Sequence, residues 1–463
     1  MLQRIDLTGG RARPPELATL LERAASITGA DDAVAPILTA VREHGAAAVL
    51  DAGERFDGVR PAALRVPADV LSVSLQGLDP ALRGALTEMI ERVRKTHQAQ
   101  LPQPAETHLT PGGTVTQRWI PVRRVGLYVP GGLAVYPSSV VMNVVPAQVA
   151  GVDEIVVCSP PQAGNGGWPD PAVLAACALL GVSEVYAAGG AQAIALLGYG
   201  SSADSTGSTD NAADADSIAA VDVITGPGNA YVTAAKRALR GTVAIDSEAG
   251  PTEIAVLADD SADPRLIAAD LISQAEHSPD AASVLITDSA QLADAVLDAL
   301  PDLVAATTHA ERVRQALSGQ QSAVVLTADL DAAVALTNEY AAEHLEIQTR
   351  HAGRIAQRIR NAGAIFLGPY SPVSLGDYCA GSNHVLPTAG GARYSSGLNT
   401  TTFLKSVQVI DYSAAALAAV APSVVVLADA EDLPAHGAAV TARFDQAVDG
   451  EAADGEATGG AGR

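Results

Sequence analysis

Two short segments of this chain carry side chains that could do chemistry together. Gln274-Ala275-Glu276-His277 places a carboxamide and an imidazole three residues apart on one face of a predicted helix, as a metal site needs. Glu343-His344 places a carboxylate beside an imidazole, as proton transfer needs. The chain has only nine His residues, so the use of several of them in such settings favours an enzyme.

The residues alone leave the metal site open. Gln274 and His277 could equally be a polar pair at the C-terminus of a helix. Asp377 and His436 could add ligands, but an Asp after Gly is commonly a turn residue and a His near a helix start is commonly a solvated cap. Neither H-E-x-x-H nor C-x-x-C occurs, so the strong zinc signatures are absent.

Glu343 and His344 also have two interpretations. Adjacent side chains on a helix point about 100° apart, which suits one residue that activates water and another that takes a substrate proton. The alternative is an exposed Glu and a His at the end of the helix predicted over 330–342. Cys379 could attack an aldehyde, although a buried inert thiol is the more common case.

Three glycine-containing turns end predicted strands and precede predicted helices. They are the segments 126–132, 189–192 and 226–229. Ligands bind at the carboxyl edge of an open parallel sheet, where glycine lets the backbone approach phosphate and helix N-termini attract anions. No segment is a complete G-x-G-x-x-G, and each alone is more often a tight turn. Three of them on one edge indicate a dinucleotide or a similar anion.

The hydrophobic pattern predicts an α/β fold. Residues 1–120 are expected to be mostly helical, because apolar residues recur three and four apart. Strands then alternate with helices, and the strands are expected at 125–129, 154–158, 184–188, 221–225, 243–245, 253–257, 283–287, 322–327 and 364–367. This alternation predicts two Rossmann-like parallel-sheet domains, with smaller helical N-terminal and C-terminal segments.

Composition restricts the class of protein further. The 463 residues are 48% hydrophobic, 17% charged and only 3% aromatic, which fits aliphatic α/β layers. A formal net charge of −23 repels nucleic acid and anionic membranes, so neither is an expected partner. Three Cys residues predict a reducing, cytoplasmic location. We expect no signal peptide and no apolar run long enough to span a bilayer.

A series of segments matches one enzyme family in order and spacing. They are GLYVPGGLAVYPSSVVMN, GGAQAIA, GPGNAYVTAAKR, AGPTEIAVLAD, DLISQAEHSPD, NEYAAEHLE, GDYCAGSNHVLPT and EDLPAH. Together they resemble the histidinol dehydrogenase family, from the first helices to about Phe444. The resemblance implies oxidation of L-histidinol to L-histidine through an aldehyde level, as the last step of histidine biosynthesis. It also implies two NAD⁺ per reaction and one Zn²⁺ per subunit.

The resemblance implies a role for each matching residue. His344 would be the general base and Glu343 would activate water. The implied zinc ligands are Gln274, His277, Asp377 and His436. The implied substrate contacts are Thr252, Gln274, His277, His344, Asp377, Glu431 and His436, and the implied NAD⁺ contacts are Tyr128, Gln192 and Asn229. The family is a homodimer with intertwined terminal segments, so Glu431 and His436 would enter the partner's active site.

We expect five parts along the chain. Residues 1–24 form an N-terminal arm, and residues 25–124 with 246–396 form the first α/β domain. Residues 125–245 form the second α/β domain, which contacts NAD⁺ and carries a disordered insertion at 201–217. Residues 397–444 form a dimerisation segment, and residues 445–463 form a disordered acidic tail.

The chain departs from the family pattern at a few positions. Thr252 stands where Ser is usual, Ala342 replaces a Pro, and Ser278 replaces a Gly. The insertion lies near a cofactor-contacting helix. Two other functions remain as alternatives: a zinc hydrolase, which would need no nucleotide, and a non-catalytic binding protein on the same fold.

Overall fold

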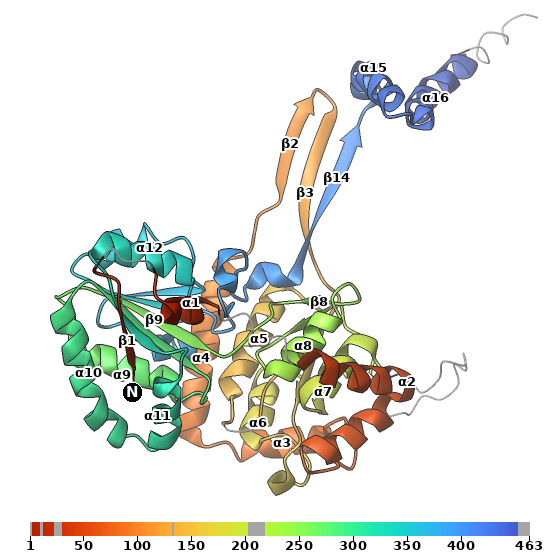
Figure 1. The fold of residues 1–463 in the computed structure, drawn as a ribbon. Coiled ribbons are helices and arrows are strands. Elements are labelled where there is room, and N and C mark those ends of the chain that lie inside the picture. Colours follow the sequence, from red (N-terminus) through yellow and green to blue (C-terminus); the bar gives the residue numbers. More distant parts are fainter. Residues whose placement is uncertain (1, 10–12, 23–29, 132–133, 202–217, 452–463) are drawn as a thin grey trace, which may run out of the picture. The chain divides into compact units, whose positions relative to one another are not determined.

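The computed structural model describes residues 2–9, 13–22, 30–131, 134–201 and 218–451, without the side chains of residues 445–451. The chain divides into two compact units. The first comprises residues 1–101 and 121–403, and the second comprises residues 102–120 and 404–463 (Figure 1). Except for Ser201, the predicted insertion lies outside the described residues, as do residues 452–463 of the predicted tail.

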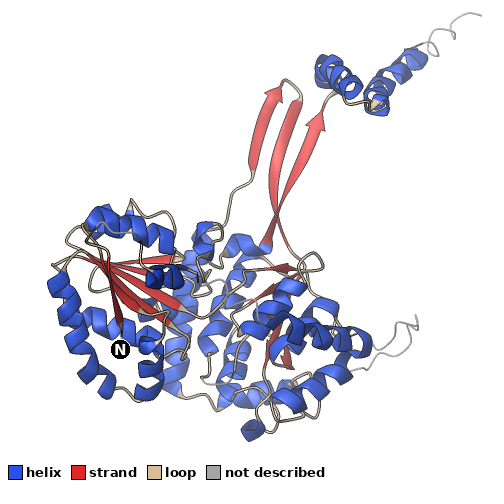
Figure 2. Ribbon diagram, in the orientation of Figure 1, coloured by secondary structure: helices blue, strands red, loops and turns tan. Residues whose placement is uncertain are grey.

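A six-stranded parallel sheet forms one part of the first unit, in the order β1-β11-β10-β9-β12-β13. Its strands are β1 (Gln3–Asp6), β9 (Glu253–Ala258), β10 (Ala282–Thr287), β11 (Ala323–Leu326), β12 (His344–Gln348) and β13 (Ala364–Leu367). Alternate residues of β9 enter two different apolar clusters. Helices therefore cover both faces, as buried parallel strands require (Figure 2).

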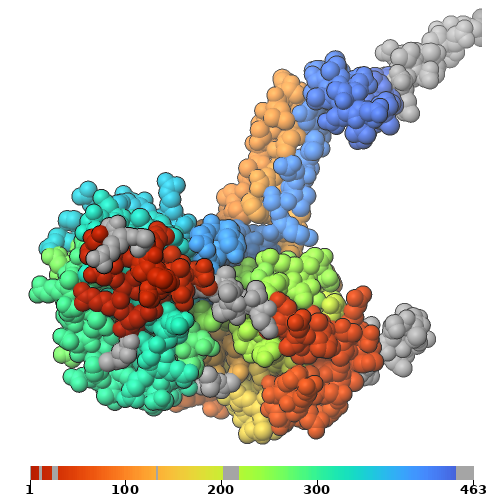
Figure 3. All heavy atoms as spheres, in the orientation of Figure 1, coloured from red at the N-terminus to blue at the C-terminus, as the bar shows by residue number. Residues whose placement is uncertain are grey.

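One face of this sheet packs against α9 (Pro264–Ala275), α10 (Ala290–Ala305) and α11 (Ala310–Ser318). The other face packs against α1 (Pro15–Leu21), α12 (Leu330–Tyr340) and α13 (Ala352–Ala356). The described part of the predicted N-terminal arm thus belongs to this layer, because β1 pairs with β11 and α1 buries Leu17 and Leu20. Figure 3 shows these first residues, in red, lying on the part of the unit coloured green to cyan.

A five-stranded parallel sheet forms the other part of the first unit, in the order β6-β5-β4-β7-β8. Its strands are β4 (Arg124–Tyr128), β5 (Glu154–Ser159), β6 (Glu184–Ala187), β7 (Val223–Thr225) and β8 (Ala244–Ile245). The helices between them are α5 (Pro137–Ala150), α6 (Pro171–Leu179), α7 (Gly190–Tyr199) and α8 (Ala230–Ala238). Both blocks of alternating strands are therefore parallel sheets, as the pattern predicted.

The early helices pack differently from the domain prediction. They are α2 (Asp31–Phe56), α3 (Ala68–Gln76) and α4 (Pro80–Ala99). α2 contacts α7 and α8, α3 contacts α6, and α4 contacts α5. These helices therefore pack on the helices that belong to the five-stranded sheet, whereas the prediction grouped residues 25–124 with residues 246–396. An amphipathic pattern shows that a helix is half-buried, but it does not show which sheet the helix covers.

Helix α2 has the length and hydropathy to span a membrane, in contrast to the expectation, but Gly45 interrupts its helical backbone with a φ of 55°. Its buried residues include Val34, Leu38, Val41 and Val49, at spacings that place Val34, Leu38 and Val41 on one side. Val34, Leu38, Val41 and Val49 belong to the apolar cluster shared with α7 and α8. This arrangement is typical of a helix that packs on a protein core.

Residues 1–120 are mostly helical, as predicted, but the second unit adds strands that the prediction did not include. It contains a three-stranded sheet in the order β14-β3-β2, formed by β2 (Ala105–Thr110), β3 (Gly113–Pro121) and β14 (Leu404–Tyr412). Most residues of β2 and β14 are exposed, so no buried stripe marks them in the sequence. Two helices follow, α15 (Ala414–Ala430) and α16 (Pro434–Glu451), and α16 continues past residue 444, where the predicted dimerisation segment ends and the predicted tail begins.

The loop after β7 is held by a buried ion pair. Asp246 accepts a hydrogen bond from Gly226 N at 2.8 Å, and Lys236 Nζ donates to Gly226 O at 3.0 Å while pairing with Asp246. The side chains of Lys236 and Asp246 are 2% and 4% exposed. Gly226 has a φ of 115°, and a Cβ there would lie 2.0 Å from Tyr128 O. Only glycine therefore fits at this position.

We expect Lys236→Met to lower the free energy of unfolding by about 3–5 kcal/mol, because it leaves the Asp246 carboxylate buried without its partner. Urea unfolding of the metal-free protein measures this loss. Arg358→Met is the control, since it breaks an exposed pair with Asp331 and should cost less than about 1 kcal/mol. Equal losses in the two variants would contradict a structural role for the buried pair.

Candidate active site

Glu343 lies in a buried position immediately before β12. Helix α12 ends at Tyr340, Ala341 takes a left-handed conformation with φ 51°, and the chain then enters the sheet. Glu343 is 6% exposed, and its Oε2 accepts hydrogen bonds from Thr252 Oγ1 at 2.6 Å and Glu253 N at 3.0 Å. The interpretation of an exposed Glu at a helix end is therefore wrong. Thr252 has the same hydroxyl as the Ser that is usual at this position, and this hydroxyl orients the Glu343 carboxylate.

Burial raises the pKa of Glu343 to about 7. The hydrogen bonds from Thr252 and Glu253 N oppose this shift, while the nearby Asp377 adds to it and His277 opposes it. A carboxyl group with such a pKa exchanges its proton readily near neutral pH, which is the property of a general acid or base.

His344 is the first residue of β12 rather than the end of a helix. Its Nδ1 lies 3.1 Å from Glu253 O and 3.6 Å from Glu343 Oε2, so the carbonyl is its closer partner. A carbonyl only accepts, so Nδ1 carries the proton and Nε2 keeps a free lone pair. Burial lowers the pKa of His344, and the neutral ring packs at 53° to the ring of Phe366.

Gln274 joins this group through Thr252. Its Nε2 donates to Thr252 Oγ1 at 2.6 Å, and the residue is 1% exposed. Its Oε1 has no hydrogen-bond partner among the described residues. A buried oxygen with unused lone pairs costs free energy of folding unless a cation or a hydrogen-bond donor binds to it. The structure therefore provides an acceptor that fits a bound metal ion.

His277 lies just beyond α9, which ends at Ala275. Its Nδ1 is 3.3 Å from Ser273 O, so this nitrogen is the donor and Nε2 is free to bind a cation. Gln274 and His277 thus lie at the C-terminal end of one helix, where the backbone carbonyls also favour positive charge.

Asp377 is the last residue of α14 (Val373–Asp377). Its charge acts on Glu343 and His344, so it belongs to the same group. His384 is a residue that the sequence analysis missed. Its Nδ1 lies 3.1 Å from Asp377 O, its Nε2 lies 3.3 Å from Ser139 Oγ, and burial lowers its pKa. The feature of the sequence that could have identified His384 is its position in the long loop after Leu367.

Two of the predicted residues lie in the second unit. Glu431 follows the last residue of α15, and His436 lies in the first turn of α16. Their assignment to an active site stays a prediction. The described residues contain no group of three or more His, Cys, Asp or Glu that could hold a metal ion. Gln274, as a carboxamide, does not count toward such a group.

The three predicted cofactor contacts lie at the carboxyl edge of the five-stranded sheet. Tyr128 ends β4, and its hydroxyl accepts from Gly190 N at 3.1 Å. Gln192 lies in the first turn of α7, and Asn229 caps α8 by accepting from Tyr231 N and Val232 N. After β4 the chain adds β5 and β6 on one side of that strand, and it then adds β7 and β8 on the other side. The direction in which strands are added therefore reverses between β4 and β7. Ligands of open α/β sheets bind at such reversals.

Asp57 is a second residue that the sequence analysis missed. It follows the end of α2, and its Oδ2 accepts from Gln192 Nε2 at 3.4 Å. Burial raises its pKa to about 6. No motif in the sequence marks this residue, because it lies far from the three glycine-containing turns along the chain.

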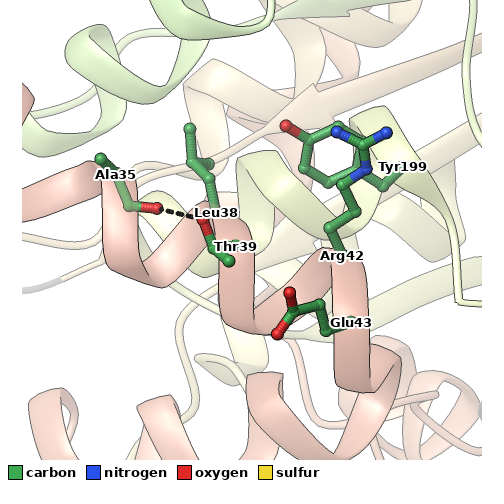
Figure 4. A pocket seen from close by; sticks show the side chains of 6 residues that line it. All are labelled: Ala35, Leu38, Thr39, Arg42, Glu43 and Tyr199. Carbon is green, nitrogen blue, oxygen red and sulfur yellow. Dashed lines mark hydrogen bonds between the residues drawn. The ribbon is translucent and has the colours of Figure 1, made fainter.

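A cavity of about 460 Å³ lies elsewhere, over α2 and the end of α7. Figure 4 shows its six lining side chains, which are Ala35, Leu38, Thr39, Arg42, Glu43 and Tyr199. The Arg42 guanidinium lies 5.7 Å from the centre of the Tyr199 ring. None of the predicted site residues lines this cavity.

The fold and the site define a two-sheet α/β enzyme with acid–base side chains buried at the amino-terminal edge of one sheet. The family model described as histidinol dehydrogenase matches residues 21–444. The chain therefore belongs to the histidinol dehydrogenase family, and it is an oxidoreductase.

Relatives and a solved structure agree with this assignment. The chain is 60% identical over 445 residues to a histidinol dehydrogenase of Nocardia farcinica, covering 96% of this chain and 98% of the relative. It is 59% identical over 447 residues to that of Mycobacterium tuberculosis (strain ATCC 25618 / H37Rv), covering 96% and 99%. The crystal structure of histidinol dehydrogenase from Elizabethkingia anophelis matches with a TM-score of 0.87 at 30% identity, covering 96% of this chain and 98% of that one.

We expect Glu343→Gln to reduce the pH dependence of stability between about pH 4.5 and 7. The native carboxyl keeps its proton up to about pH 7, whereas the unfolded one loses it near its ordinary value of 4.5. The native state thus binds more protons in this window, so parent stability falls as pH rises, by up to about 1.4 kcal/mol per pH unit from this group.

Urea unfolding of the metal-free protein at pH 5, 6 and 7 measures this difference. Glu311→Gln is the control, because Glu311 is exposed and should leave the parent's pH dependence unchanged. Identical slopes for Glu343→Gln and the parent would show that Glu343 has an ordinary pKa.

Proposed function

We propose that this protein oxidises L-histidinol to L-histidine through an aldehyde level, using two NAD⁺ and one zinc ion per subunit. The observation that carries the proposal is the buried Glu343–Thr252–Gln274 chain beside His344, in a member of this family. It supplies a base, a water-activating carboxyl group and an unused buried oxygen in one place.

The proposed zinc ligands are Gln274, His277, Asp377 and His436. Gln274 Oε1 supports this set because it is buried without a partner among the described residues. His277 Nε2 supports it because the other ring nitrogen is occupied by Ser273 O. A zinc ion bound there would hold and orient the substrate, and it has no redox chemistry of its own.

The two oxidations need two proton acceptors. In the first, His344 Nε2 would take the proton of the alcohol oxygen, and NAD⁺ would serve as the acceptor of the hydride from the alcohol carbon. In the second, Glu343 would take a proton from the water that adds to the aldehyde, and the resulting hydrate anion could give its hydride to a second NAD⁺ to form the carboxylic acid. Thr252 and Glu253 N hold the Glu343 carboxylate while it receives that proton.

The cofactor and the partner subunit complete the proposal. NAD⁺ would bind across the β4–β7 reversal, with Tyr128, Gln192 and Asn229 among its contacts. The protein would act as a homodimer with intertwined terminal segments, in which Glu431 binds substrate and His436 binds zinc in the partner's active site.

The purified protein should form two NADH per L-histidinol consumed. Chelation should abolish this activity, because substrate loses its orienting ion, and added zinc should restore it. Absorbance of NADH against the loss of histidinol gives the ratio. A folded, zinc-loaded protein that forms no NADH would rule out the proposed reaction.

His344→Ala should lower the rate of NADH formation by about 10²–10⁴-fold, because it removes the base that takes the alcohol proton. Its zinc content should equal that of the parent, since His344 is not a proposed ligand. His351→Ala, at an exposed position, is the control and should behave as the parent does. Loss of zinc from His344→Ala would instead make His344 a metal ligand.

A further inference from the structure

Strand β12 carries an unusual buried polar residue. Its sequence alternates, and Leu345 and Ile347 enter the apolar cluster beneath α12. His344, Glu346 and Gln348 point to the opposite face, which is covered by α9. Glu346 is 0% exposed. Its register partners on that face are Val256 of β9 and Phe366 of β13, so its carboxyl group lies among apolar side chains.

Glu346 contacts two other elements from this position. Its Oε1 accepts a hydrogen bond from Val373 N, the first residue of α14, at 2.9 Å. Its side chain also hydrogen-bonds the carboxyl group of Asp270, in the middle of α9. Gln348, on its own strand, adds a weaker side-chain hydrogen bond. One side chain therefore connects β12, α9 and α14.

Two carboxyl groups can form a hydrogen bond only if one of them is protonated. Burial raises the pKa of Glu346 well above its ordinary value, and the adjacent Asp270 adds to the shift. Oε2 of Glu346 receives no N–H or O–H donor from the described chain, which agrees with a protonated carboxyl group. Glu346 thus donates to Asp270 at neutral pH.

Each of the three connected elements bears a residue of the active site. α9 carries Gln274, β12 carries His344 and α14 carries Asp377. We propose that Glu346 is a positioning residue that fixes the spacing of these three elements through Asp270 and the Val373 amide. The meaning of that spacing rests on the function proposed above, but the connection itself does not.

Two variants of Glu346 separate positioning from simple burial. Glu346→Gln keeps an acceptor for Val373 N and a donor for Asp270, so it should behave as the parent does. Glu346→Leu has a similar size, and Asp270 is only partly buried, so the fold should survive at some cost in stability from the Val373 N–H that loses its acceptor. It removes both connections, and we expect it to weaken zinc binding by about 10–100-fold, as the loss of outer-sphere partners does.

Cys379 provides a readout that needs neither metal nor activity. It lies two residues after Asp377, is partly exposed, and its N–H donates to Leu375 O at 3.0 Å. Cys158 and Cys177 are both 0% exposed. The rate at which N-ethylmaleimide labels Cys379 in the metal-free protein therefore reports how firmly α14 is held. Glu346→Leu should raise that rate severalfold, and Glu346→Gln should not.

Ser283→Ala is the matched control. Ser283 is also buried in the six-stranded sheet, and its hydroxyl donates to Leu271 O of α9 at 2.8 Å. The hydrogen bonds described for its backbone N–H and its hydroxyl go to Ser322 Oγ and Leu271 O rather than to α14, so its loss should leave labelling of Cys379 and zinc affinity unchanged. If Ser283→Ala raised the labelling rate as much as Glu346→Leu, general loosening of the sheet would replace the proposal.

Three measurements give distinct outcomes: Cys379 labelling, zinc content by mass spectrometry and NADH formation. Faster labelling and weaker zinc binding in Glu346→Leu, both restored in Glu346→Gln, support the positioning role. Unchanged labelling in Glu346→Leu overturns it, whatever the activity. If the parent binds no zinc and forms no NADH, the proposed function fails, and the labelling rate still decides whether Glu346 holds α14.

Discussion

A buried carboxylate needs hydrogen-bond donors, and the way in which Glu343 obtains them organises the site. Thr252 Oγ1 and Glu253 N donate to one of its oxygens. Thr252 in turn accepts from Gln274, and the Glu253 carbonyl fixes the tautomer of His344. The start of β9 thus orients an acid–base carboxyl group, an imidazole and a carboxamide. The parallel pairing of β9 with β12 is what brings these donors within reach.

The residues singled out in the two sheets lie at opposite edges, at the strand starts of one sheet and at the strand ends of the other. Glu253 and His344 are the first residues of their strands, so the acid–base group lies at the amino-terminal edge of the six-stranded sheet. Tyr128 and the Gly226 loop lie at the carboxyl-terminal edge of the five-stranded sheet, where anions are usually bound. At the first edge, α9 directs its carbonyl end toward the site, which favours a cation. The sign of the charge that each edge favours therefore depends on which ends of the strands and helices lie there.

The sequence pattern predicted the alternating elements well, because buried parallel strands are apolar and their turns contain glycine. It failed for β12, whose segment His344-Leu345-Glu346-Ile347-Gln348 alternates polar and apolar residues. Such a pattern normally places the polar side in water, but here both sides are buried. Thr252, Gln274 and Glu343 meet only through strand pairing and tertiary packing. No local spacing encodes that meeting, and only the resemblance to a family grouped these residues before the fold was known.

The contact between Gly226 and Tyr128 has a mechanical consequence. The backbones of the two turns that flank the β4–β7 reversal touch so closely that only a hydrogen atom fits between them. Lys236 and Asp246 hold one of these turns from behind. The two turns are therefore held against each other by a backbone contact and, on one side, by a buried ion pair. A ligand at this edge would meet two turns that leave no room for a side chain between them at position 226.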